Sequence, residues 1–174
     1  MGAVALARQT MLDAQWHRQA TAASAANPLL PRVDPSRTFA ALTAVVDGEQ
    51  LVIADASDEQ FLLRADAFAR EFGLRLAVRG NGREYRQVDL IKKSGRAVIV
   101  PVSFPQPPNV ETVSAALDVS LEQLMHWDLA PENAARLDAA GVPIALTAYG
   151  LKDVSEFLPA VRRAVERGLS ADSA

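Results

Sequence analysis

The chain has 174 residues, of which 49% are hydrophobic, and its net charge is −3 at pH 7 with a pI near 5.4. This length and composition fit one globular domain of roughly 100–200 residues with a hydrophobic core. The chain is too short for a complete (β/α)8 barrel, which takes about 250 residues. Nothing in the charge balance indicates a nucleic acid or an anionic membrane surface as a partner.

Several residue types and segments are missing from the sequence. It contains no cysteine and only two histidines, which excludes disulfides, thiol nucleophiles and cysteine-ligated zinc or iron–sulfur sites. No apolar run approaches the roughly 20 residues that cross a membrane. The opening MGAVALARQT lacks the basic and apolar regions of a secretion signal, which favours a cytoplasmic location. A periplasmic or secreted location stays open if the chain belongs to a longer protein.

The first 46 residues are expected to form two helices. Residues 3–22 are rich in Ala, Leu, Gln and Arg, which favour helices. The segment NPLLPRVDPS, 27–36, carries three prolines and predicts a connection. Residues 36–46 predict a second helix, with Ser36 as its N-cap.

Four short apolar segments follow and predict strands. They lie at 50–55, 74–80, 97–104 and 143–149. Helices are expected after Ser57, at 85–95, near 121–128, from Pro131 to about 140 and in the last stretch before 168, whereas 104–118 is expected to be a proline-rich loop. Short buried strands alternating with helices are typical of parallel strands joined by right-handed crossovers.

The sequence therefore predicts an α/β fold with four parallel strands and flanking helices. We expect a single domain over 1–174, made of a helical segment 1–46, four βα units over 47–168 and a frayed tail at 169–174.

Three helix starts carry local signals. Ser57 with Gln60, and Ser120 with Gln123, have the spacing of a capping box. The last helix is expected to open near Asp153, and its internal Pro159 to move the start to about residue 156.

Four long segments resemble a known family. They read FGLRLAVRGNGREYR, GRAVIVPVSFPQPPNVE, VSLEQLMHWDLAPENAARLDAAGVPIALTAYGLKD and FLPAVRRAVERGLS. In this order they resemble the C-terminal half of the amidohydrolase superfamily, and they look closest to bacterial imidazolonepropionase-like amidohydrolases. The opening RQTMLDAQWHRQA is similar to the helix after the fourth barrel strand of such proteins.

The resemblance implies a metal-dependent hydrolase on a (β/α)8 barrel, in which the four strands of this chain would be strands five to eight. Such enzymes activate a metal-bound water, with an H-x-H on strand one and further ligands at the ends of later strands. No H-x-H is present here. Asp55 stands at or beside the strand-five histidine, Arg79 or Asn81 at the strand-six histidine, and 147–149 at the strand-eight aspartate.

The candidate catalytic residues are Asp55, Thr147 and Tyr149, and Asp55 is also the one candidate metal ligand. Asp55 follows a strand, where barrel active sites are built. It is interpreted either as a metal or substrate contact or as a carboxylate hydrogen-bonded to the start of the next helix, which the helix dipole favours. Thr147 and Tyr149 either bind a ligand or cap backbone groups.

A second candidate group is Arg79, Asn81 and Arg83, in and around the turn GNGREY. Glycines before a helix start can cradle an anion, and a tight turn explains them as well. His17 and His126 stand beside tryptophans without a motif such as H-E-x-x-H, so both are expected to pack rather than to act.

Two functions follow from these residues. The first is an amidohydrolase-like half-barrel without a complete metal site, which self-associates as a homodimer through its open sheet edges or inner face, or is part of a longer protein. The alternative is a hydrolase of amide or cyclic amide C–N bonds, with a zinc-like metal site completed by a partner chain or an N-terminal half. No cofactor is expected in this chain alone.

Overall fold

The computed structural model describes residues 2–174 and divides the chain into two compact units. Unit 1 extends to Val52 and includes Phe68–Arg75, whereas unit 2 contains Ile53–Ala67 and Leu76–Ala174. The division passes through one strand and one helix. The prediction of a single domain over 1–174 stays a prediction.

Unit 1 contains two helices, α1 (Gly2–Ala26) and α2 (Arg37–Val46). Helix α1 is longer than expected because its alanine-rich end continues the helix as far as the residues before Pro28. The predicted N-cap of α2 is confirmed, since the Ser36 hydroxyl accepts a hydrogen bond from the Phe39 amide at 3.3 Å. Met11 and Ala14 form the buried stripe of α1.

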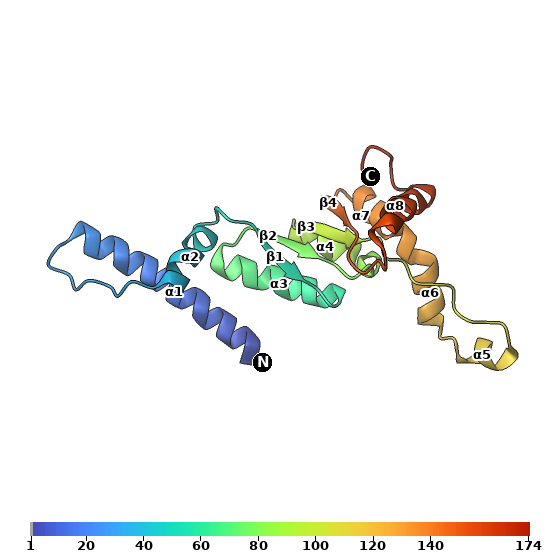
Figure 1. The fold of residues 1–174 in the computed structure, drawn as a ribbon, viewed down its shortest axis with the longest axis horizontal. Coiled ribbons are helices and arrows are strands. Elements are labelled where there is room, and N and C mark those ends of the chain that lie inside the picture. Colours follow the sequence, from blue (N-terminus) through green and yellow to red (C-terminus); the bar gives the residue numbers. More distant parts are fainter. Residues whose placement is uncertain (1) are drawn as a thin grey trace. The chain divides into compact units, whose positions relative to one another are not determined.

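Unit 2 is built on a sheet with the strand order β1-β2-β3-β4 (Figure 1). The strands are β1 (Val52–Asp55), β2 (Leu76–Arg79), β3 (Ala97–Pro101) and β4 (Ile144–Thr147). The pairings of β2 with β3 and of β3 with β4 are parallel. This confirms the predicted fold class, although each strand is two or three residues shorter than its apolar segment suggested.

One face of the sheet holds the core of unit 2. Alternate strand residues point to opposite faces, and Val78, Val98 and Val100 are almost completely buried. Helices flank the sheet: α3 (Glu59–Phe72), α4 (Val88–Ser94), α7 (Asn133–Ala139) and α8 (Phe157–Glu166). Their side chains Leu62, Ile91, Leu137 and Ala164 have no exposed surface, which completes this core.

Helix α3 begins differently from the prediction. The Asp58 carboxylate accepts a hydrogen bond from the Phe61 amide at 2.6 Å, so Asp58 caps the helix in place of Ser57. A carboxylate is a strong cap because it also interacts favourably with the helix dipole. The other capping box is confirmed, since Ser120 and Gln123 bond reciprocally at the start of α6 (Leu121–Leu129).

The predicted loop 104–118 was wrong in its last six residues, where a short helix α5 (Val113–Asp118) forms behind a Thr112 cap. Short 3-10 turns also break the expected helices: η1 (Glu84–Arg86) precedes α4, η2 (Ala130–Glu132) contains Pro131, and η3 (Val154–Glu156) precedes α8. Pro159 lies in the first turn of α8, where its missing amide is tolerated.

The C-terminal end of unit 2 is partly packed. Leu169, the first residue of the predicted frayed tail, is buried, and its amide bonds to the Ala164 carbonyl at 3.0 Å. No helix in residues 2–174 is long and apolar enough to cross a membrane.

Candidate functional site

Three sequence candidates meet at the carboxyl edge of the strands in unit 2. Arg79, the last residue of β2, donates a hydrogen bond from Nη2 to Oδ2 of Asp55 at 2.7 Å. Its guanidinium carbon also lies 3.6 Å from the ring centroid of Tyr149. The guanidinium therefore bridges the end of β1 and the segment after β4 through one ion pair and one cation–π contact.

Asp55 is paired with a neighbouring side chain, and its role as a metal or substrate contact stays a prediction. Its carboxylate pairs with Arg79, whereas the hydrogen bond at the start of α3 comes from Asp58. The expected hydrogen bond from Asp55 to the helix start is therefore wrong. The Asp55 side chain is 67% exposed and that of Arg79 27% exposed, so water screens the pair.

Thr147 and Tyr149 lie at the same edge. The Thr147 hydroxyl oxygen accepts a hydrogen bond from the Tyr149 amide at 3.2 Å, which is the local backbone role that hydroxyls often take. Tyr149 is exposed and presents its ring to Arg79. Gly150, at φ +87°, lies against Ser103, and a Cβ there would stand 2.6 Å from the Ser103 hydroxyl.

The turn after β2 already holds an internal anion. The buried Glu84 carboxylate accepts hydrogen bonds from the amides of Asn81 at 2.7 Å and Gly82 at 3.2 Å. Gly80 is required because a side chain there would collide with this carboxylate. The amides that the sequence suggested as an anion cradle are thus satisfied by the chain itself.

Glu84 is a structural residue that the sequence reasoning missed. It is 1% exposed and accepts a third hydrogen bond from the Asn133 amide group at 2.5 Å. Asn133 in turn accepts from the Tyr85 amide at 2.7 Å, which ties the turn to α7. The signal in the sequence is a glutamate placed two residues after Gly82, close enough to reach back to the turn amides.

Asn81 and Arg83 are held by neighbouring groups. Asn81 donates to the Ser57 carbonyl at 2.7 Å and accepts from the Arg83 amide at 3.0 Å. The Arg83 guanidinium donates to Glu122 at 2.5 Å, and Arg86 donates to the same carboxylate at 2.9 Å. These two cations hold the pKa of Glu122 below its usual value. Anion binding by Arg79, Asn81 or Arg83 stays a prediction.

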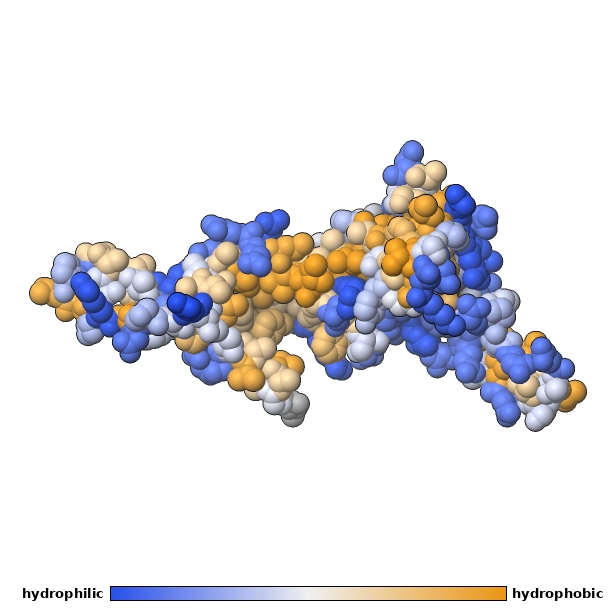
Figure 2. Space-filling model, in the orientation of Figure 1, coloured by the Kyte–Doolittle hydropathy of each residue, from blue (hydrophilic) through white to orange (hydrophobic). Residues whose placement is uncertain are grey.

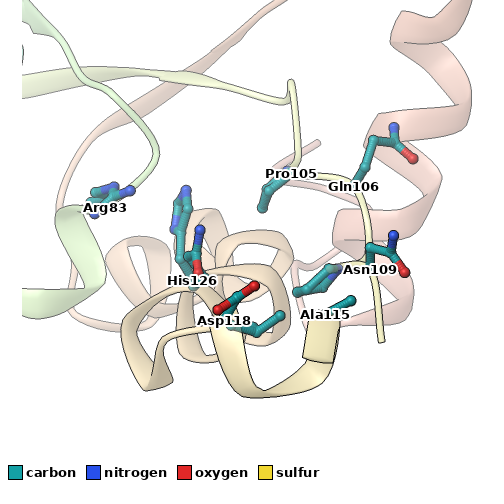
Figure 3. A pocket seen from close by; sticks show the side chains of 10 residues that line it. Arg83, Pro105, Gln106, Asn109, Ala115, Asp118 and His126 are labelled. Carbon is teal, nitrogen blue, oxygen red and sulfur yellow. The ribbon is translucent and has the colours of Figure 1, made fainter. Parts of the chain in front are cut away.

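A groove of about 530 Å³ lies beside Arg83, between the loop after β3 and helices α5 and α6 (Figure 3). His126 lies on its wall, with its ring stacked at 6.2 Å from Tyr85 and its Nδ1 3.4 Å from the Tyr85 hydroxyl. Partial burial, and then the nearby charges of Arg83 and Arg86, lower the pKa of His126. Its imidazole is therefore neutral near pH 7. His17 contacts Phe39 instead, as a packing residue.

The residues at the strand edge do not fit a metal site held by this chain. In residues 2–174, no group of three or more His, Cys, Asp or Glu side chains is placed to hold a metal ion. The one carboxylate at the expected position is bonded to a guanidinium, and a divalent cation there would face a positive neighbour. Hard cations need several oxygen ligands at once.

The fold defined here is an α/β sheet of four parallel strands flanked by helices, with Asp55, Arg79, Thr147 and Tyr149 at its carboxyl edge. No protein-family model matches the chain, and no curated protein matches it. The chain is similar to the solved structure of an amidohydrolase from Thermotoga maritima MSB8, with a TM-score of 0.74 and 17% sequence identity.

That match covers 99% of this chain and 42% of the amidohydrolase chain. The present chain therefore spans less than half of the length of that protein, and its fold corresponds to part of an amidohydrolase chain. At 17% identity the likeness establishes the fold, whereas activity depends on the site residues.

Proposed function

We propose that this chain is an amidohydrolase-like partial barrel that holds no catalytic metal with its own residues and acts by associating with another sheet. The observation that carries the proposal is the Arg79–Asp55 ion pair at the carboxyl edge of the strands. A guanidinium is a permanent cation. Here it bonds to Asp55, the carboxylate that the resemblance places at the position of a metal ligand.

The association part of the proposal rests on the second face of the sheet. Strand register places Ala77 beside Ala97, and Arg79, Ile99 and Ala145 in one row across three strands. Ile53 on β1 is 57% exposed, and Ala145 is exposed as well. Parallel sheets are normally covered on both faces, so this uncovered face favours a partner.

Metal binding by the purified chain tests the proposal. We expect no stoichiometric zinc, manganese or nickel after loading and desalting, measured by elemental analysis, and no hydrolysis of a panel of amides and cyclic amides. The matched control is Asp55→Asn, which removes the one candidate ligand while keeping its size. One metal ion per chain in the natural protein, lost in Asp55→Asn, would contradict the proposal.

The second candidate is a hydrolase of amide or cyclic amide C–N bonds, including the imidazolonepropionase-like reactions, whose zinc-like site is completed by another chain or another half. The exposure of Asp55 at the carboxyl edge favours this candidate, because an exposed carboxylate there can bind a metal ion together with ligands from another chain or another half. Metal uptake that appears only when a complementary half is added would support this candidate.

A further inference from the structure

We infer that the partner of the uncovered face is a second copy of this chain, and that two copies close an eight-stranded parallel sheet in which β4 of each copy pairs with β1 of the other. This inference rests on the proposed function and names its partner. In such an assembly the residues at the carboxyl edge of both copies, including Asp55, Arg79 and Tyr149, surround one shared mouth.

The two sheet edges of unit 2 fit this arrangement. The strand order leaves β1 and β4 as outer strands, each paired on one side. The carbonyls of Pro143, just before β4, and of Thr147, its last residue, accept hydrogen bonds from the amides of Val98 on β3 and of Val102 just after it. Backbone groups alternate in direction along a strand, so those of Ile144 and Leu146 face the open edge.

The other edge is matched in the same way. The Ala56 amide at the end of β1 bonds to the Arg79 carbonyl at 2.8 Å, which turns the alternate groups of Ile53 and Asp55 outward. A two-fold axis along the strands keeps all strands parallel and brings β1 of one copy beside β4 of the other at both seams. One symmetric contact therefore removes both edges, which are otherwise templates for uncontrolled pairing.

The composition of the uncovered face suits a second copy. Ile53, Ala97, Ile99 and Ala145 make its accessible part mainly apolar, with small side chains that allow close approach, whereas Ala77 in the same row is already buried. Figure 2 shows hydrophobic residues at the surface over the region of these strands.

The charges on this face are compatible with self-association. Its two charged residues, Asp55 and Arg79, neutralise each other within one copy. Facing copies therefore bring no net like charge together.

The size of the related fold points the same way. One copy matches 42% of the Thermotoga amidohydrolase chain, so two copies approach the size of the whole protein. A four-stranded parallel sheet cannot close by itself, whereas eight strands give a barrel whose interior is filled by side chains. Two copies supply that number of strands without any other component.

Sedimentation velocity of the natural chain over a range of micromolar concentrations tests the inference. We expect a species of twice the chain mass, and we expect Ile53→Glu to shift the population to the single-chain mass, because a charge would be buried in the contact. The matched control is Leu158→Glu, since Leu158 is also exposed, at 62%, but lies on α8. Circular dichroism shows whether each variant keeps its fold.

A natural chain of single-chain mass at all concentrations would overturn the inference, as would an Ile53→Glu variant that still dimerises. Equal loss of dimer in the Leu158→Glu control would do the same. None of these results changes the metal content, so a failure here is distinguished from a failure of the proposed function.

Cross-linking tests the seam itself. The chain has no cysteine, so each introduced thiol is unique. We expect a mixture of Ile53→Cys and Ala145→Cys chains to form a covalent dimer with a short bismaleimide, whereas Leu158→Cys mixed with Ile53→Cys does not. Equal cross-linking of both mixtures would overturn the β1–β4 seam.

Discussion

The ion pair between Asp55 and Arg79 lies at the carboxyl edge of this sheet. In a metal-dependent hydrolase, this edge holds ligands around an open coordination position. Here the guanidinium bonds to the carboxylate and stacks on Tyr149, so the same edge is occupied by a cation of the chain itself. An exposed pair of this kind contributes little to stability. Substitution of Asp55 or Arg79 is therefore expected to leave the protein folded.

The contact between Asp55 and Arg79 was not predictable from one sequence. Both residues were identified as candidates, Asp55 at the end of one predicted strand and Arg79 near the end of the next. Their pairing depends on the register of neighbouring parallel strands and on the choice of a side-chain conformation, and apolar periodicity does not encode either of these.

Glu84 gives a sharper prediction at the residue scale. We expect Glu84→Gln to lower the free energy of unfolding by about 2–3 kcal/mol. The buried carboxylate accepts three hydrogen bonds, whereas a glutamine would turn an NH2 group, itself a donor, towards some of the same donors. Urea denaturation measures the change. Glu122→Gln is the control, since Glu122 bonds to two arginines at an exposed position and its loss should cost less. Equal losses in both variants would contradict the buried role of Glu84.

His126 predicts a dependence of stability on pH. Burial and neighbouring arginines lower its pKa in the folded chain, so the unfolded chain binds a proton more readily. The stability of the neutral form is full above the unfolded pKa of about 6.5 and falls as the pH drops through that value towards the lower folded pKa.

His126→Gln removes this contribution. We therefore expect the difference in unfolding free energy between the natural chain and the variant to change between pH 7.5 and pH 5.5, in favour of the variant at low pH. Taking the difference between the two proteins removes the contribution of the carboxylates that titrate in the same pH range, because that contribution is common to both. An identical pH dependence in both would show that His126 keeps its ordinary pKa.

At the scale of single elements, the start of α3 shows which of two neighbouring residues caps the helix. The run S-D-E-Q offers Ser57 and Asp58 as neighbouring caps, and the structure uses Asp58. We expect Asp58→Ala to lower the free energy of unfolding by about 1 kcal/mol, the usual value of an N-cap. Ser57→Ala should change it by much less, because the Ser57 contact to Asn81 uses its backbone carbonyl. Thermal unfolding of both variants measures this, and the reverse order would restore the sequence prediction.

The elements show why local signals succeed in some places and fail in others. Ser36 and Ser120 are single good caps before clear helices, and both were predicted. Two adjacent caps leave the choice to tertiary packing, which a sequence window does not contain. The helix α5 was missed because the prolines at 105–108 dominate the segment, although Thr112 provides an ordinary cap for the six residues after it.

At the scale of the whole molecule, the order of the sheet was predictable and its completion was not. Four apolar segments separated by helices specify parallel strands, and sequential strands pair as neighbours. The pattern of apolar residues does not specify what covers the second face of the sheet. Burial alternates along β1 and leaves Ile53 exposed. In a parallel sheet covered on both faces, an isoleucine at this position would be buried.

If a second copy covers that face, as we propose, the stability of the fold depends on protein concentration. If two folded chains associate and the unfolded chains do not, mass action favours the folded dimer by about 1.4 kcal/mol for each tenfold rise in concentration. We expect the Tm of the natural chain to rise steadily between about 1 and 100 μM. Ile53→Glu should unfold at a concentration-independent Tm, whereas Leu158→Glu should keep the dependence, because Leu158 is an exposed residue of α8 and not of a strand. Calorimetry at three concentrations separates these cases, and a flat Tm in the natural chain would mean that its uncovered face is not covered by another copy of itself.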